Sequence, residues 1–173
     1  MIIAVAGSGG KTTRVHKLAQ YYRSLGKKVF VTTTTHMKKE SDTVIPENIE
    51  DIRKQLNETG YCMAGMPATP ENALVQKIGP LPEDFYETAV KEADITLIEA
   101  DGSRGMPAKI PADYEPVIHE NIDEIHIVIG MSALGKPASK VVHRLSLADK
   151  DLEIKEDTIL TPVSYTHLTL PTI

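Results

Sequence analysis

The sequence predicts an α/β fold of the P-loop NTPase type, with three layers in which helices cover both faces of a mainly parallel sheet. Short apolar runs alternate along the chain with amphipathic segments of helical periodicity, a pattern typical of strands joined by crossover helices. The first apolar run leads directly into a glycine-rich turn with a lysine, which is typical of phosphate-binding loops. In such folds ligands bind beyond the carboxyl ends of the strands.

Length, composition and charge limit the classes of function. The 173 residues suit one domain, since a domain of this size buries about 70% of its unfolded surface. A net charge of -5 without a basic stripe argues against a nucleic-acid partner, whose phosphates need Lys and Arg. The single Cys62 excludes an internal disulfide framework, and the apolar run at residues 2–6 is too short to cross a membrane. We therefore expect a cytoplasmic protein, and a small phosphate ligand remains compatible with its acidic charge.

The first elements form a strand, a turn and a helix, followed by a second strand. Residues 1–6 are a continuous apolar run and predict a strand buried on both faces. Residues 12–25 carry apolar side chains at helical spacing, and Gly26 stands where a left-handed helix end belongs. Residues 28–32 predict a second strand, which runs into four threonines and a histidine.

The middle of the chain continues this alternation. Residues 47–58 predict a helix that ends before Gly60, and residues 61–64 predict a short strand. Residues 66–82 contain several prolines and predict a loop, with one turn of helix around residues 73–78.

A third helix and two more strands are predicted in the second half. Residues 82–93 form the helix, and its inward side chains are Phe85, Ala89, Val90 and Ala93. A strand follows at residues 95–98. After a Gly/Pro-rich loop, residues 125–129 predict another buried strand that ends at Gly130.

The turn after the first strand reads Gly7-Ser8-Gly9-Gly10-Lys11-Thr12-Thr13. A phosphate loop needs glycines that let N–H groups turn inward, a lysine for the β- and γ-phosphates and a hydroxyl for Mg²⁺. This G-x-x-G-K-T-T form is shorter than the common pattern and is similar to that of the ATP-dependent Mur ligases. The alternative, a glycine-rich turn with an incidental lysine, is disfavoured by its place between strand and helix. We expect Lys11→Ala to weaken triphosphate binding and leave the fold intact, because a solvated loop would carry the lysine.

Two acidic residues follow the strand at residues 95–98. Glu99 and Asp101 lie two positions apart, so on an extended chain their carboxylates would share one face of the site. Mg²⁺ prefers hard oxygen ligands, and we therefore expect Thr12, Glu99 and Asp101 to hold it, or one carboxylate to hold a nucleophile. The alternative is that these acids only form a turn before Gly102.

Other polar residues lie close to predicted strand ends. Thr34 and Thr35 could contact phosphate or metal, although a threonine-rich strand end can also reflect β propensity alone. His36 and the loop residues Arg104, Lys136, His143 and Arg144 could reach a ligand, and the alternative for each is a solvated surface residue. We expect His16, His119 and His126 to be structural.

Several blocks of sequence together resemble the YqeC family of selenium-dependent hydroxylase accessory proteins. The blocks are VAGSGGKTT at residues 5–13, VTTTTH at 31–36, EADGSRG at 99–105, ALGKP at 133–137 and VHR at 142–144. The resemblance extends to about residue 162. It implies a nucleotide-dependent role in the maturation of molybdenum hydroxylases that also need selenium, with one of these enzymes or another maturation factor as partner. The resemblance implies functional roles for Thr34, Thr35, Glu99, Asp101 and Arg104. Together with Lys11 of the phosphate loop, Glu99, Asp101 and Arg104 are the expected catalytic residues.

Three functions remain open at this point. An NTPase would drive cofactor or selenium handling through a conformational change, with Mg²⁺ and ATP or GTP as its ligands. A ligase or transferase of the Mur type would use Arg104 or His36 to position an acceptor. A scaffold would bind nucleotide without turnover. The sequence shows no N-K-x-D segment of guanine-specific GTPases, so ATP is the first choice.

The end of the chain departs from the family pattern. Residues 1–162 are expected to form a nucleotide-binding domain that is incomplete at its C-terminal end, whereas residues 163–173 resemble a translated sequencing adaptor. We expect residues 164–173 to pack on no coherent core and residues 149–160 to expose apolar side chains. The alternative is an ordinary edge strand, since residues 165–170 have fair β propensity.

Overall fold

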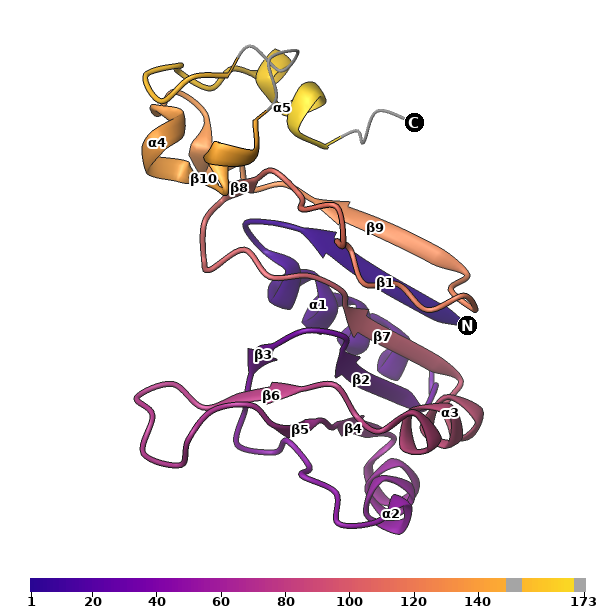
Figure 1. Cartoon of the computed structure of the whole chain (residues 1–173). Coiled ribbons are helices and arrows are strands. Elements are labelled where there is room, and N and C mark those ends of the chain that lie inside the picture. The colour runs from indigo at the N-terminus through magenta and orange to yellow at the C-terminus, as the bar shows by residue number, and fades with distance from the viewer. Residues whose placement is uncertain (149–153, 170–173) are drawn as a thin grey trace.

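Five parallel strands form the central sheet of the computed structural model, which describes residues 1–148 and 154–169 (Figure 1). The strand order is β4-β2-β7-β1-β9. Their bounds are Ile2–Gly7 for β1, Val29–Thr33 for β2, Tyr61–Met63 for β4, Ile95–Glu99 for β7 and Glu124–Val128 for β9. The chain leaves β1 towards β2 and later crosses back to add β9 on the other side of β1. The carboxyl end of β1 is therefore a point where the strand order reverses.

Helices cover both faces of this sheet, which confirms the α/β class. Helix α1 (Lys11–Ser24) packs on one face, where Val15 and Leu18 meet Ile3 and Val31. Helices α2 (Ile49–Thr59) and α3 (Glu83–Glu92) cover the other face. Because side chains alternate along a strand, neighbouring residues of β1 serve opposite cores.

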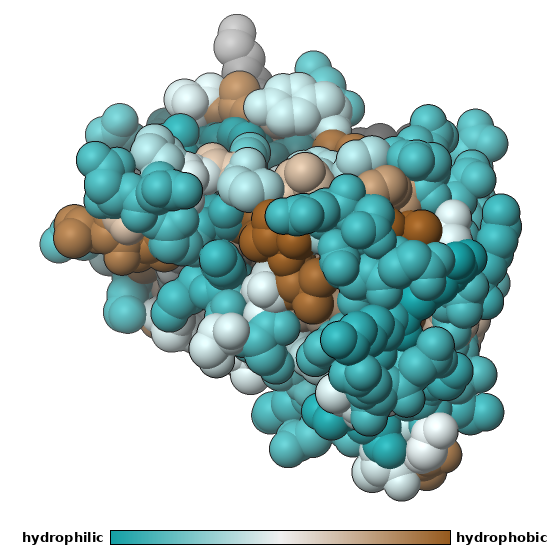
Figure 2. Space-filling view, turned by 90° about the horizontal axis from the view of Figure 1, so that it is seen from below, coloured by the Kyte–Doolittle hydropathy of each residue, from teal (hydrophilic) through white to brown (hydrophobic). Residues whose placement is uncertain are grey.

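The helix ends follow the expected signals. Gly26 has φ +73°, and the N–H groups of Gly26 and Lys27 donate to the carbonyls of Arg23 and Tyr22 after α1. Helix α2 starts at a capping box of Asn48 and Asp51. Seen from the side on which α2 lies in Figure 1, the surface is mostly hydrophilic with small hydrophobic areas (Figure 2).

Helix α3 buries a different side chain than expected. Tyr86 and Ala89 are buried, whereas Phe85 and Val90 are only partly buried. The helical spacing was predicted correctly, but the buried face of α3 is centred on Tyr86 and Ala89 instead of on Phe85 and Val90.

A small antiparallel sheet occupies the segment that was expected to be a loop with a helical turn. Strand β6 (Lys77–Gly79) pairs with β3 (Met37–Lys38) on one side and with β5 (Met66–Pro67) on the other. The expected turn of helix around residues 73–78 is therefore wrong. Ile78 is fully buried in the core beside α1, and this long-range pairing has no local periodicity that a sequence pattern could show.

Strand β9 exists as predicted but is not a buried strand. It lies at the edge of the sheet, and Ile125 and Ile127 are each 50% exposed. An apolar run alone does not distinguish an edge strand from a central one.

The last part of the chain folds beside the carboxyl ends of the strands (Figure 1). Strands β8 (Ala108–Lys109) and β10 (Val142–His143) pair in parallel. Three short helices follow or flank them. They are η1 (Met131–Ala133), α4 (Ala138–Val141) and η2 (Leu145–Leu147).

Residues 162–169 form helix α5 (Pro162–Thr169) rather than the edge strand considered above. Tyr165 and Leu168 are buried in a cluster with Ile154 and Leu160, and the Tyr165 hydroxyl donates to the Gly130 carbonyl at 2.6 Å. The expectation that residues 164–173 pack on no core is thus wrong for these two side chains. Residues 149–153 and 170–173 lie outside the described residues, and the assignment of 163–173 as non-native stays a prediction.

The expected exposure of apolar side chains in residues 149–160 is met only in part. Ile159 is 51% exposed, whereas Ile154 and Leu160 are buried. None of the described helices is long and apolar enough to span a membrane.

Candidate functional site

The turn between β1 and α1 has a shape that requires glycine. Gly7 and Gly9 have φ values of +96° and +74°, in the left-handed region. A Cβ atom on Gly7 would lie 2.2 Å from the Val128 carbonyl oxygen, and one on Gly9 would lie 2.4 Å from the Gly130 Cα atom. The loop therefore lies closely against the end of β9 and the residues after it.

The first two residues of the loop are used by the protein itself. The Gly7 N–H donates to Asp101 Oδ2 at 2.8 Å, and the Ser8 N–H donates to the Val128 carbonyl at 2.8 Å. The Ser8 hydroxyl donates to the Pro107 carbonyl. Gly7 and Ser8, which were expected to contact phosphate, thus fix the loop instead of facing the cleft.

The next five residues present N–H groups that are open to a ligand. Gly9 and Gly10 donate no backbone hydrogen bond to any described residue. Lys11, Thr12 and Thr13 form the first turn of α1, where a helix has no internal acceptor for its N–H groups. A helix N-terminus also carries partial positive charge, so this stretch is suited to bind an anion.

Lys11 is buried rather than solvated, which corrects the expectation for this side chain. It is 5% exposed, and its ammonium lies 3.2 Å from Asp101 Oδ1 and donates to the Gly7 carbonyl at 2.7 Å. The Asp101 contact is a charge contact without hydrogen-bond alignment, since Oδ1 has no hydrogen-bond donor among the described residues. The lysine is held at the loop where phosphate oxygens would compete with Asp101 for it.

Thr12 and Glu99 meet as the sequence predicted. The Thr12 hydroxyl donates to Glu99 Oε2 at 2.9 Å, and Glu99 is 7% exposed. Burial raises the pKa of Glu99, and the Lys11 charge and the Thr12 hydrogen bond partly offset this. A hydroxyl and a carboxylate are ligands that Mg²⁺ accepts beside phosphate oxygens and water. No described group of three or more His, Cys, Asp and Glu side chains forms a metal site by itself.

Asp101 does not join Glu99 in the cleft. Strand β7 ends at Glu99, so the alternation of an extended chain stops there, and Asp101 turns behind the loop. Its Oδ2 lies 2.8 Å from the Lys109 ammonium, which in turn lies 2.6 Å from Glu115. Glu115 pairs with Arg144, and these cations lower the pKa of Glu115 although burial opposes them. Asp101 is thus placed to position the loop and Lys11 rather than to bind a metal.

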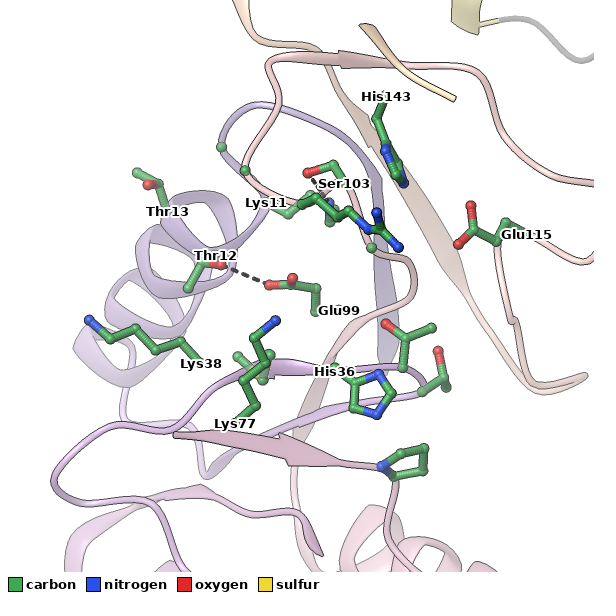
Figure 3. A pocket seen from close by; sticks show the side chains of 18 of the residues that line it. Lys11, Thr12, Thr13, His36, Lys38, Lys77, Glu99, Ser103, Glu115 and His143 are labelled. Carbon is green, nitrogen blue, oxygen red and sulfur yellow. Dashed lines mark hydrogen bonds between the residues drawn. The ribbon is translucent and has the colours of Figure 1, made fainter. Parts of the chain in front are cut away.

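Residues 10–13 and Glu99 line one cleft of about 820 Å³, whereas Gly9 is not among its lining residues (Figure 3). Its cationic side chains outnumber its carboxylates, although the whole chain carries a net charge of -5. The cations are Lys11, Lys38, Lys77, Arg104 and Arg144, and the carboxylates are Glu99 and Glu115. The local field therefore favours an anionic ligand.

The threonine run forms another wall of this cleft. The Thr33 hydroxyl and the Thr34 N–H both donate to the Glu99 carbonyl, which ties this segment to the end of β7. The Thr34 hydroxyl donates to the Val117 carbonyl, whereas the buried Thr35 hydroxyl has no partner among the described residues. Thr35 and the exposed His36 therefore remain candidates for ligand contact.

The four loop residues that were considered as ligand contacts do not all reach the cleft. Arg104, His143 and Arg144 line the cleft as considered above, whereas Lys136 does not. Sequence reasoning missed Lys38 and Lys77, which line it from the small sheet. No local signal marks these lysines, because only the pairing of β3 with β6 brings them together.

The three histidines that were expected to be structural contact neighbouring side chains. His16 pairs with Glu40, His119 stacks on Tyr86, and His126 lies 3.1 Å from Glu124.

Comparison with known proteins gives one family and two relatives. Residues 3–146 match the family model described as YqeC protein. The chain is 32% identical to the uncharacterized protein YqeC of Escherichia coli strain K12, over 84% of this chain and 58% of the relative. It is 30% identical to the signal recognition particle 54 kDa protein of Hyperthermus butylicus, over 83% of this chain and 30% of the relative. No solved structure matches it significantly.

Proposed function

The chain belongs to the YqeC family, and from this premise we propose that it binds a nucleoside triphosphate with Mg²⁺ and hydrolyses it. The observation that carries the proposal is the meeting of three features in one cleft. These are the open N–H groups of residues 10–13, the Lys11 ammonium and the hydrogen-bonded pair of Thr12 and Glu99. Together they offer donors, a cation and metal ligands to a polyphosphate.

The position of the cleft in the fold supports this proposal. It lies at the carboxyl ends of β1, β2 and β7, where the strand order reverses. Parallel α/β sheets bind their ligands at such points, because the flanking loops diverge there. The similarity to the signal recognition particle protein also hints at a relation to P-loop NTPases.

In the proposed complex the β- and γ-phosphates accept hydrogen bonds from the N–H groups of residues 10–13. The Lys11 ammonium then contacts the phosphates as well as Asp101, and Asp101 keeps Lys109 as its second cationic partner. Mg²⁺, where bound, would be held by Thr12 and Glu99 and would neutralise phosphate charge. The N–H groups and Lys11 then stabilise the charge that develops during phosphoryl transfer to water.

We assign to this activity the accessory role that the family resemblance implies. Nucleotide turnover would assist the maturation of selenium-dependent molybdenum hydroxylases, with the hydroxylase or another maturation factor as client. The chain spans 58% of its Escherichia coli relative, so this role is proposed for the longer protein.

A second candidate, a nucleotide-dependent transferase or ligase, is favoured by one specific observation. The cleft continues past the phosphate loop to Arg104, His143 and Arg144, which leaves room for an acceptor. Phosphate release that needs an added acceptor would support this reading over simple hydrolysis.

The test is phosphate release from ATP and from GTP, with and without Mg²⁺. We expect Mg²⁺-dependent release by the unchanged chain and a loss of it in Thr12→Ala, which removes the hydroxyl beside Glu99. Lys17→Ala on the same helix is the control, since Lys17 is exposed and does not line the cleft. Tight nucleotide binding without phosphate release under any of these conditions would contradict hydrolysis and would support a nucleotide-sensing scaffold.

A further inference from the structure

The cleft contains a second cationic group beyond the phosphate loop. Arg104 comes from the loop after β7, and His143 and Arg144 come from β10 and the residue after it. Figure 3 shows His143 on the side of Ser103, whereas Lys38 and Lys77 lie on the opposite side of Glu99. Two segments about 40 residues apart in sequence, at 104 and at 143–144, thus contribute to one end of the cleft.

Both arginines adopt a backbone conformation that is unfavourable for their residue type. Arg104 has φ +49° and Arg144 has φ +59°, and they are the two residues other than glycine with positive φ among the described residues. Such conformations carry a free-energy cost and persist where the surrounding structure imposes them, often at functional sites. Here both residues line the same cleft.

The donors of this group are only partly used. One terminal nitrogen of Arg144 donates to Glu115 and the other donates to the Tyr114 hydroxyl at 3.4 Å, which leaves three of its five N–H groups unused among the described residues. The side chains of Arg104 and His143 have no hydrogen-bond or ion-pair partner among the described residues, although the His143 carbonyl accepts from the Ile110 N–H. A free guanidinium beside a half-used one offers the paired N–H donors that bind phosphate or carboxylate groups.

The electrostatic environment of His143 agrees with this geometry. Burial lowers the pKa of His143, and the charges of Arg144, Arg104 and Lys109 lower it further. Glu115 is the carboxylate that acts in the opposite direction, and it is already shared by Lys109 and Arg144. Positive charge therefore exceeds negative charge at this end of the cleft.

We propose that Arg104, His143 and Arg144 form an oxyanion subsite, which holds the phosphate or carboxylate group of a second substrate next to the nucleotide. The proposal rests on the proposed nucleotide site for its role, but the subsite itself is built from other residues. Arg144 is fixed by Glu115, and Glu115 by Lys109, so the subsite is anchored to Asp101 behind the phosphate loop. The ligand would then lie near the phosphates of the bound nucleotide.

The experiment follows the His143 ring by NMR across pH in the chain saturated with Mg²⁺ and a non-hydrolysable ATP analogue. Inorganic phosphate and malonate are added in separate titrations. We expect at least one of them to raise the pKa of His143, because a bound anion stabilises the protonated imidazole. A response to phosphate alone would assign a tetrahedral oxyanion, and a response to malonate a carboxylate.

Two variants test whether the change in the pKa of His143 arises from binding at the subsite. Arg104→Gln should weaken the binding of the probe at least tenfold, and its side chain has no partner whose loss would disturb the fold. Lys77→Gln, a cleft cation on the opposite side, is the matched control and should retain the response. No shift with either probe, or an unchanged affinity in Arg104→Gln, would overturn the proposal.

The nucleotide site and the subsite can fail separately. If the ATP analogue does not bind, the proposed function fails, and the probes are then titrated into Lys11→Ala without nucleotide. A shift of His143 under that condition still supports the subsite. Its absence there overturns the subsite as well.

Discussion

At the scale of single residues, the buried pair of Lys11 and Asp101 changes what the lysine is expected to do. Lys11→Ala leaves Asp101 Oδ1 without its cation in a site where Asp101 is 2% exposed. We expect the free energy of unfolding to fall by about 1–3 kcal/mol, because Lys109 still compensates part of the charge. Chemical denaturation measures this, with the exposed Lys17→Ala on the same helix as control. Equal stability of all three proteins would mean that the ion pair contributes nothing.

Removing the charge of Asp101 and removing that of Glu99 should have different effects on the free energy of unfolding. Asp101→Asn removes the partner of two buried lysines, and we expect a loss of about 3–5 kcal/mol of stability. Glu99→Gln keeps a hydrogen-bond acceptor for Thr12 and removes a charge that burial disfavours, so the fold should not lose stability. Denaturation of both variants at neutral pH provides the comparison. A larger loss in Glu99→Gln would contradict the separate roles given to them.

The raised pKa of Glu99 also predicts a pH dependence. The folded chain holds this proton to higher pH than the unfolded chain, so stability should fall as pH rises from 4.5 through the raised value. Mg²⁺ with nucleotide needs the charged form, so its affinity should rise through the same window. Parallel titrations of unchanged protein and Glu99→Gln test this. The pH dependence should be absent from the variant, and its persistence would assign it to another group.

At the scale of elements, the contact between the phosphate loop and the end of β9 should be intolerant of any side chain. Gly9→Ala places a methyl group 2.4 Å from the Gly130 Cα atom and adds strain at φ +74°. We expect a loss of about 2 kcal/mol or more, because backbone must shift to relieve the clash. Gly102→Ala is the control, since its Cβ would meet no atom within 4 Å. Thermal unfolding compares the two variants. Equal stability of both would contradict a close contact between Gly9 and Gly130.

The elements that were predicted are those with their own local signal. Residues 1–6 and 95–98 have continuous apolar runs, and α1 and α2 have helical spacing with glycine at their ends. The pairs β3–β6 and β8–β10 involve strands of two or three residues, and such short strands show no period. Their pairing depends on the surrounding core.

The residues of the site also separate into those with a local sequence signal and those without one. Lys11, Thr12 and Glu99 could be predicted because the motif and the strand end specify their places. The positions of Asp101 and Lys77 could not, since a turn after β7 moves the first and a long-range strand pair brings in the second.

At the scale of the whole molecule, the order β4-β2-β7-β1-β9 determines what meets at the cleft. Placing β7 between β2 and β1 brings the threonine run, Glu99 and the phosphate loop to the same edge. The order could not be predicted from the sequence, because all five strands are short apolar runs that do not specify neighbours. The α/β class could be predicted, because it depends only on the alternation of elements.

Whether this cleft binds a nucleotide is tested by titration calorimetry of ATP and GTP with Mg²⁺ on the unchanged chain and on Lys11→Ala. We expect one nucleotide per chain and an affinity that falls roughly 10- to 100-fold in the variant, since a charge-assisted contact is lost. Lys17→Ala should bind as the unchanged chain does. Absence of binding for both nucleotides, or equal affinity in Lys11→Ala, would contradict the assignment of this cleft as a nucleotide site.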